Sequence, residues 1–274
     1  MDYNQFFLEK AFENRDILLS HEVLSKYSDK ISIIMKGSTA RRCADSISDT
    51  DIVIFTDEKH FEKIITEYYN LGLCPNPSGI FLPLPYGHYN LDRYSSIEKY
   101  IKDEFMPQIW EYSNVDFLHD PYEIFENLTM PMVEKIFTPQ HSVELILKKY
   151  IDIQLTADWM GQPLKRADYF AAFLHYSKFI QLVAHICFLI DKKPYPHDKW
   201  LGFYLPETDL GKEIAPKLLS YMQKTSEKIN ITPMQELEKY VQYEEAMNII
   251  EYIKEGIRSK YENFAWIEQW TCWA

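Results

Sequence analysis

Apolar residues up to about residue 121 follow two spacings, one typical of helices and one typical of short buried strands. Helical spacing predicts helices over residues 4–26, 58–71 and 95–110. Short apolar runs predict strands over residues 31–35, 51–55, 80–84, 88–94 and 114–119, with a Pro- and Asn-containing loop over residues 74–79. The first part of the chain is therefore expected to be a mixed α/β unit.

Beyond residue 121 the strand signals nearly vanish and helical spacing takes over. Apolar residues at helical spacing cover residues 139–158, 165–191, 210–227 and 233–261. Four such segments predict a helical bundle. We expect an α+β protein with two closely packed domains, a mixed-sheet domain over residues 1–121 and an all-α bundle over residues 122–274.

Composition and charge narrow the class of protein. The 274 residues include 41 Asp and Glu against 29 Lys and Arg, a formal net charge of -12. Aromatic residues make up 15% and there are only 8 glycines, which excludes a disordered chain. The acidic balance argues against a protein that coats nucleic acid, because phosphate binding needs a basic surface. It is compatible with a cationic ligand or with an anionic ligand bridged by a metal.

Cysteine spacing and hydropathy favour a cytoplasmic protein without a membrane partner. Cys43, Cys74, Cys187 and Cys272 form no CxxC pair, which indicates free thiols rather than a zinc site or disulfides. The first ten residues carry charges where a signal peptide needs an apolar run. The most apolar segment, residues 171–190, is interrupted by polar side chains and fits a buried helix better than a membrane span.

The residues from Lys36 to Phe55 carry the most informative chemistry. A strand ends at Gly37-Ser38 and a helix-like stretch follows, so that exposed N–H groups can receive a phosphate, although Ser38 can also serve only as a helix cap. Asp49 and Asp51 lie two residues apart at the edge of the next strand, which places both carboxylates on one face. Paired carboxylates beside phosphates are typical of Mg²⁺ sites, and two ions about 4 Å apart support nucleotidyl transfer. Such a site needs a third carboxylate.

This stretch resembles the signature of the DNA polymerase β-like nucleotidyltransferase superfamily. Within it, GSTARRCADSISDTDIVIF is similar to the corresponding segment of the aminoglycoside 6-adenylyltransferases. The resemblance covers about residues 31–121 and implies a third carboxylate on a later strand. Asp92 in NLDRY is the best match, and Asp116 in VDFLHD is the alternative.

The second half resembles a different branch, nucleotidyltransferases whose function is not settled, through the element KPYPHDKWL over residues 193–201. Lys199 in this element is either a surface residue of the bundle or a contact to a triphosphate. Arg41 and Arg42, expected in the first helical turn after Ser38, have the same two interpretations, because an arginine fork suits phosphate.

Together these features predict a Mg²⁺-dependent nucleotidyltransferase. Asp49, Asp51 and Asp92 are the expected metal and catalytic residues. The expected nucleotide-binding residues are Gly37, Ser38, Arg41, Arg42 and Lys199. The resemblance implies transfer of AMP from ATP, or of another nucleotide, to a hydroxyl of a small acceptor, with an aminoglycoside-like antibiotic and a role in antibiotic resistance as the expected case.

Three alternatives stay open. The first is an antitoxin-like nucleotidyltransferase that modifies a protein or a tRNA, against which the absence of a basic run argues in the tRNA case. The second is a catalytically silent nucleotide-binding or regulatory module, and the third is a purely structural interaction protein. The sequence also leaves open whether the chain forms a homodimer.

Overall fold

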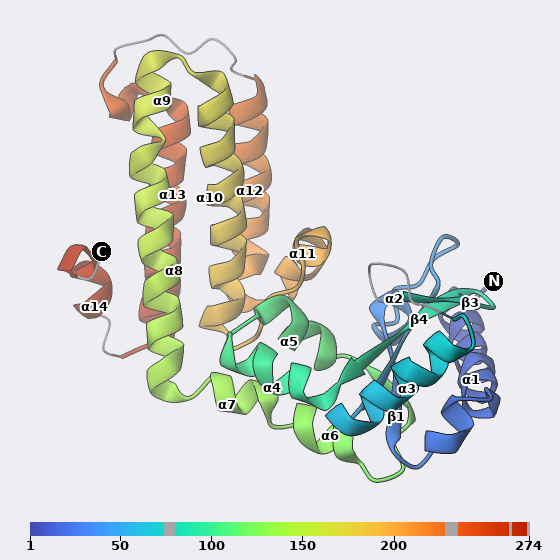
Figure 1. Cartoon of the computed structure of the whole chain (residues 1–274). Coiled ribbons are helices and arrows are strands. Elements are labelled where there is room, and N and C mark those ends of the chain that lie inside the picture. Colours follow the sequence, from blue (N-terminus) through green and yellow to red (C-terminus); the bar gives the residue numbers. More distant parts are fainter. Residues whose placement is uncertain (74–79, 228–234, 263–264, 273–274) are drawn as a thin grey trace. The chain divides into compact units, whose positions relative to one another are not determined.

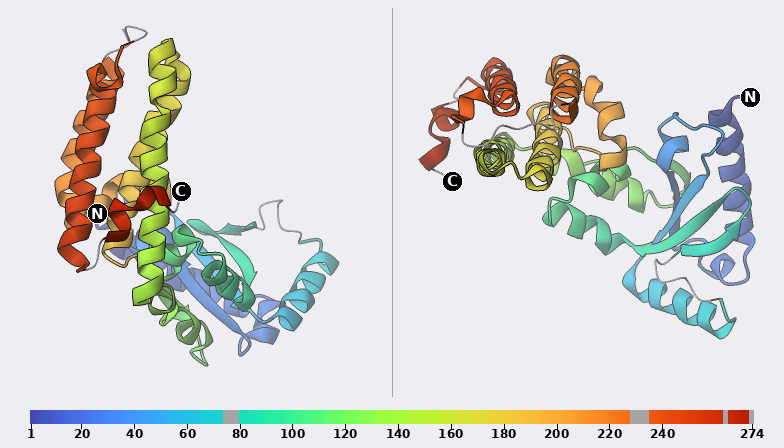
Figure 2. Two further views of the ribbon diagram at one scale, coloured as in Figure 1. Left: turned by 90° about the vertical axis from the view of Figure 1, so that its left-hand side faces the viewer. Right: turned by 90° about the horizontal axis from the view of Figure 1, so that it is seen from above.

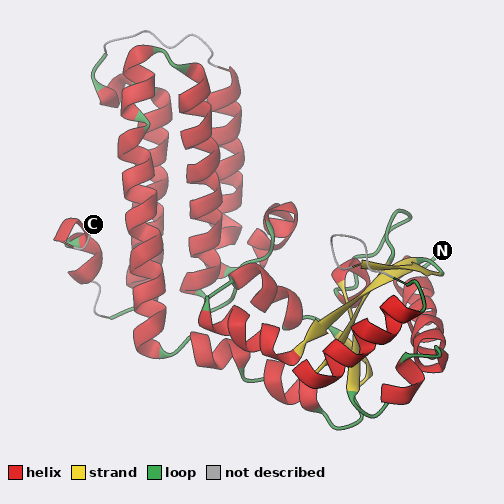
Figure 3. Cartoon of the chain, viewed as in Figure 1, coloured by secondary structure: helices red, strands yellow, loops and turns green. Residues whose placement is uncertain are grey.

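The computed structural model describes residues 1–73, 80–227, 235–262 and 265–272 and divides the chain into two units (Figure 1). The first unit is Met1–Ile136 and the second is Phe137–Ala274. Within the described residues all strands belong to the first unit, whereas the second is helical (Figure 3). The chain is therefore α+β, as its hydropathy pattern predicts.

A five-stranded mixed sheet forms the centre of the first unit, with the strand order β3-β4-β2-β1-β5. Its strands are β1 (Ile31–Lys36), β2 (Thr50–Thr56), β3 (Ile80–Leu84), β4 (Gly87–Arg93) and β5 (Asp116–His119). β2 runs parallel to β4 and antiparallel to β1, and β1 runs antiparallel to β5. Consequently β2, β4 and β5 all begin at the edge of the sheet where β1 ends.

Helices cover both faces of this sheet. On one face, α1 (Tyr3–Ser20) and α3 (Glu58–Asn70) bury Ala11, Leu18, Ile64 and Tyr68 against the inward side chains of β1, β2 and β4. The other face carries an aromatic cluster around the fully buried Phe55, whose ring contacts are Tyr94, Tyr112 and Phe125. A sheet buried on both faces explains why β1 and β2 are continuous apolar runs rather than alternating ones.

The helices that supply the aromatic cluster differ from the sequence-based prediction. In place of one helix over residues 95–110, the structure has α4 (Tyr94–Lys102) and α5 (Met106–Tyr112). The break falls at Glu104, which has a φ of 53°, and Pro107 then occupies the first turn of α5, where a proline is well tolerated. The short helices α6 (Ile124–Thr129) and α7 (Met132–Ile136), which follow the domain boundary predicted at residue 121, belong to the first unit.

Four long helices form the second unit and lie side by side (Figures 1 and 2). They are α8 (Pro139–Trp159), α10 (Tyr169–Ile190), α12 (Asp209–Glu227) and α13 (Val241–Lys260). Shorter helices connect or follow them: α9 (Gly161–Arg166), α11 (Asp198–Tyr204) and α14 (Ala265–Glu268). The structure confirms the predicted helical bundle.

Among the described residues, α10 is the one helix long and apolar enough to cross a membrane by length and composition. Of its most apolar window 61% is buried inside the protein, and all nine residues from Leu182 to Ile190 are buried. This burial fits the predicted core helix.

Candidate functional site

Three side chains that can bind a metal converge at the edge of the sheet where β2 and β4 begin. Asp51 is the second residue of β2, and Asp49 immediately precedes that strand. His88 is the second residue of β4 and is the register partner of Asp51 in the parallel β2–β4 pair. Because register partners in neighbouring strands project to the same face, the imidazole lies beside the two carboxylates.

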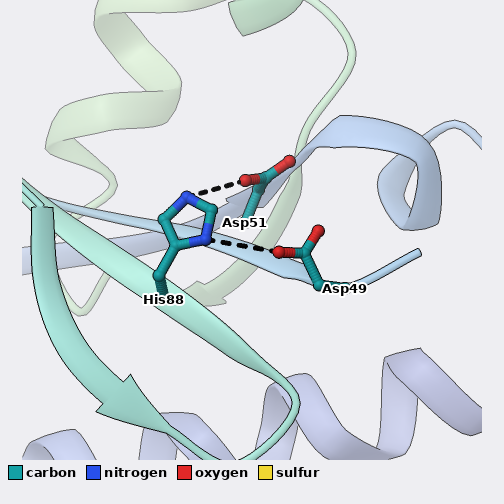
Figure 4. Close-up of side chains that lie close together, drawn as sticks. All are labelled: Asp49, Asp51 and His88. Carbon is teal, nitrogen blue, oxygen red and sulfur yellow. Dashed lines mark ion pairs between the residues drawn. The ribbon is translucent and has the colours of Figure 1, made fainter. Parts of the chain in front are cut away.

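The imidazole bridges the two carboxylates (Figure 4). His88 Nε2 lies 2.9 Å from Asp51 Oδ1, and His88 Nδ1 lies 3.3 Å from Asp49 Oδ2. Each of the three residues offers one ligand atom, and these three atoms lie within 4.8 Å of one another, so that one ion could contact all of them. The three side chains are partly exposed, with Asp49 the most open at 52% and His88 the least at 24%, so that a ligand can reach the cluster from solvent.

Contacts among the three side chains shift the pKa values of Asp49 and His88. Burial and the negative charge of Asp51 raise the pKa of Asp49 above its usual value. The hydrogen bond to Asp51 and the two negative charges raise the pKa of His88. The raised pKa favours the protonated form of His88 beside the two carboxylates. Metal binding would displace that proton, since imidazole ligates in its neutral form.

Two glycines allow the backbone to approach this cluster closely. Gly37, directly after β1, has a φ of +80°, and a Cβ at this position would lie 2.3 Å from Asp51 Oδ2. Gly87, directly before His88, would place a Cβ 2.3 Å from the carbonyl oxygen of Thr50. Both positions need glycine because any side chain would push Asp51 or the start of β2 away.

The structure brings neither predicted third carboxylate to Asp49 and Asp51. Asp92 is the register partner of Phe55, four residues further along the strands than the His88–Asp51 pair, or about 13 Å at strand spacing. There its Oδ1 accepts hydrogen bonds from Ser96 Oγ at 2.6 Å and from the backbone N–H of Arg93 at 2.7 Å.

Asp116 also lies apart from the pair. It is the register partner of Met35, whereas Asp51 is the register partner of Lys36, so that Asp116 and Asp51 project from opposite faces of the sheet. The third member of the cluster is instead His88, which the sequence analysis missed. Its position at the beginning of a predicted strand, directly after a Pro-Tyr-Gly turn, was the available signal.

The residues that follow β1, which the sequence predicts to bind phosphate, also differ in structure from that prediction. The helix after β1 is a single turn, α2 (Gly37–Ala40), so Arg41 and Arg42 follow it rather than lie in its first turn. Arg42 forms a two-pronged ion pair with Asp116, at 2.6 and 2.9 Å. The side chain of Arg41 is only 3% exposed and lies 3.8 Å from Glu111 and over the ring of Trp110. Arg41 is thus buried against α5 and Arg42 is paired with β5, and a contact of either arginine with a phosphate stays a prediction.

Ser38 and Lys199, the remaining predicted nucleotide contacts, lie in different units. Ser38 Oγ donates to Ser48 Oγ at 3.1 Å, which closes the loop that leads to Asp49. Lys199 is an exposed residue of α11 in the second unit. A contact of either residue with a triphosphate stays a prediction.

A cation that the sequence analysis did not single out lies next to Asp51. Lys36 is its register partner in the β1–β2 pair and therefore projects to the same face. Its Nζ contacts Glu111 Oε2 at 3.1 Å, and Glu111 is also the carboxylate nearest to Arg41. One glutamate thus serves two basic side chains beside the Asp49–Asp51–His88 cluster.

Comparison with known proteins finds similarity among solved structures. No protein-family model matches the chain, and no curated protein matches it. A solved structure of a nucleotidyltransferase-like protein from Exiguobacterium sibiricum is similar over 90% of this chain and 75% of that chain, with 10% sequence identity and a TM-score of 0.46. At this distance we base the function on the residues of this chain alone.

Proposed function

We propose that the first unit is a metal-dependent nucleotidyltransferase that moves a nucleoside monophosphate, AMP from ATP in the expected case, to a hydroxyl of a small acceptor. The observation that carries this proposal is the Asp49–Asp51–His88 cluster at the edge of the sheet, with the Gly37 turn packed against Asp51. It joins a cation-binding group to the glycine turn at which β1 ends.

Each residue of the site has its own chemical role in this proposal. Asp49, Asp51 and His88 would hold a divalent cation, which would neutralise triphosphate charge and polarise the α-phosphorus when bound. The acceptor oxygen forms a bond to the α-phosphorus, the bond from that phosphorus to the bridging oxygen breaks, and pyrophosphate leaves. The hydroxyl proton passes to one of the carboxylates. Lys36, on the same face as Asp51, offers a positive charge to the phosphates.

The acceptor we propose is a cationic small molecule of the aminoglycoside type. The support is the net charge of -12, which favours a cationic acceptor over a nucleic acid. The test is to measure the pyrophosphate released from each nucleoside triphosphate, with Mg²⁺ or Mn²⁺, across a panel of aminoglycosides, lincosamides and small alcohols. Release that depends on both an acceptor and Asp51 supports the proposal, and Asp51→Asn is expected to abolish it because an amide cannot replace a metal-binding carboxylate.

A specific observation favours a second function, a catalytically silent nucleotide-binding module. The site assembles only two of the three carboxylates that the resemblance implies, with His88 in place of the third. The same assay separates the two functions. A thermal shift with a metal–nucleotide complex but no pyrophosphate release from any acceptor would favour the silent module.

A further inference from the structure

The Asp49–Asp51–His88 cluster has an unusual donor set for a site that resembles a magnesium centre. Two donors are carboxylate oxygens, and the third comes from an imidazole whose two ring nitrogens face the carboxylates at 2.9 and 3.3 Å. Neither Asp92 nor Asp116 reaches the cluster, so within the described residues no third carboxylate joins it.

Ligand chemistry separates the ions that such a set can hold. Mg²⁺ is a hard cation that takes oxygen ligands and keeps several of its waters. Imidazole suits first-row transition ions, and carboxylates suit Mn²⁺ as well as Mg²⁺. A mixed set of two carboxylates and one imidazole therefore favours a transition dication, because one of its three protein donors contributes little to Mg²⁺ binding.

The position of His88 is fixed by the fold rather than by a flexible loop. The β2–β4 register sets it directly beside Asp51, and the absence of a side chain at Gly87 lets β4 approach Thr50 closely. A rearrangement that exchanged His88 for Asp92 would need a shift of four residues along the whole strand pair. Such a shift would keep Tyr89 and Leu91 on the same face but displace them by about 13 Å along the strand, away from their present neighbours in the core.

We propose that this site binds a first-row transition dication, for which Mn²⁺ is the probe, in preference to Mg²⁺, and that His88 is the ligand that sets this preference. The inference rests on the metal role of the cluster in the proposed function. It does not depend on whether a nucleotide is transferred.

The test measures binding directly on the full chain without nucleotide. Calorimetry with Mn²⁺ and with Mg²⁺ gives the two dissociation constants, and we expect Mn²⁺ to bind at least about tenfold more tightly, the lower end of the range for disturbing a metal site. Pulsed electron paramagnetic resonance of bound Mn²⁺ is expected to show coupling to a directly bound ring nitrogen. Labelling the histidines with the heavy nitrogen isotope should change that coupling without any mutation.

Variants then assign the nitrogen. His88→Asp supplies a third carboxylate and should remove the nitrogen coupling while bringing the Mg²⁺ and Mn²⁺ constants closer together. His88→Gln, which retains bulk without the imidazole, provides a second variant if the aspartate substitution prevents folding. The matched control is His60→Gln on α3, where His60 Nδ1 contacts Asp57 Oδ2 at 2.7 Å in a carboxylate–histidine pair outside the cluster. The His60→Gln chain should retain both the preference for Mn²⁺ over Mg²⁺ and the nitrogen coupling of bound Mn²⁺.

A different result in the binding measurements overturns the inference. His88 would be excluded as the selective ligand by any of three results: equal affinity of the wild-type chain for the two ions, absence of nitrogen coupling, or coupling that persists in the His88 variants. If neither ion bound, the cluster would not be a metal site. Tight, nitrogen-coupled Mn²⁺ binding without pyrophosphate release would retain the metal site and reject the transferase. Transfer supported by Mg²⁺ with no preference for Mn²⁺ would retain the transferase and reject the metal preference.

Discussion

Asn14 of α1 and Thr50 of β2, both fully buried, are joined by a hydrogen bond of 2.9 Å from Asn14 Nδ2 to Thr50 Oγ1. Thr50 is the residue between Asp49 and Asp51, and strand alternation points its side chain away from theirs. Asn14 Nδ2 also donates to the carbonyl oxygen of Pro85 at 2.8 Å. One amide thus links the beginning of β2 to the turn that leads into His88.

Replacing Asn14 with alanine should destabilise the first unit and loosen the metal site. The substitution removes the donor to the buried hydroxyl oxygen of Thr50, which costs about 1–3 kcal/mol in the free energy of unfolding. Urea denaturation of the full chain measures this loss, and calorimetry with Mn²⁺ should show weaker binding. Gln5→Ala, the same loss of an amide at an exposed position of α1, is the control and should change stability by less than about 0.5 kcal/mol. Equal effects of the two substitutions would contradict the role of Asn14.

Gly87→Ala should separate β2 from β4 at the site. The added methyl carbon would lie 2.0 Å from Thr50 Oγ1 and 2.3 Å from the Thr50 carbonyl oxygen, so that the backbone must move. We expect a loss of about 1–3 kcal/mol in stability, as for other overpacked positions, together with weaker Mn²⁺ binding because His88 moves with Gly87. Gly202→Ala in α11 meets nothing within 4 Å and should be neutral or stabilising. Unchanged stability and metal affinity in Gly87→Ala would show that the close approach is not required.

The sequence predicts the carboxylate pair but not its partner, and the reason is physical. Asp49 and Asp51 belong to one strand, where the period of two alone places them on a common face. The third ligand comes from another strand, and the register between strands depends on long-range packing. His88 and Asp92 lie four residues apart on the same face of β4, so periodicity does not distinguish them. The register of the β2–β4 pair does distinguish them, because it places His88 beside Asp51.

The predicted roles of the arginines show a similar limit. Their position after Gly37-Ser38 left open a phosphate contact or an exposed basic pair, because sequence spacing does not reveal the carboxylates that folding brings near. In the structure Glu111 on α5 approaches Arg41, and Asp116 on β5 pairs with Arg42. Both partners are more than 65 residues away along the chain. Most element boundaries, by contrast, follow from local hydropathy.

Asp92→Asn provides a direct test of the corrected ligand set. Asparagine retains an oxygen that can accept from Ser96 Oγ and from the Arg93 N–H, so the chain should fold normally. We expect Mn²⁺ affinity to stay within a factor of about three, whereas Asp51→Asn should weaken it at least about tenfold because a ligand is lost. Calorimetry on the two variants makes the comparison. A similar loss in both would restore Asp92 as a ligand.

The second unit should lose stability in mild acid because of His185. This side chain of α10 is 8% exposed, and its ring stacks on that of Tyr195 with centroids 3.8 Å apart. Burial, reinforced by the positive charge of Lys149, lowers the pKa of His185 from 6.5 to about 4, against the opposing effect of Asp198. The folded chain therefore holds this histidine neutral under conditions where the unfolded chain protonates it.

The depressed pKa of His185 sets the direction of the stability change with pH and the pH range over which it occurs. The contribution of His185 is fully present above pH 6.5 and is lost as the pH falls towards 4, because the unfolded state binds the extra proton between these values. The loss can reach about 3 kcal/mol over the window. Urea denaturation at a series of pH values measures it, and His185→Gln should flatten the dependence because glutamine does not titrate. His175→Gln, on the same helix, is the control and should retain the wild-type slope. An unchanged slope in His185→Gln would assign the acid sensitivity to other groups.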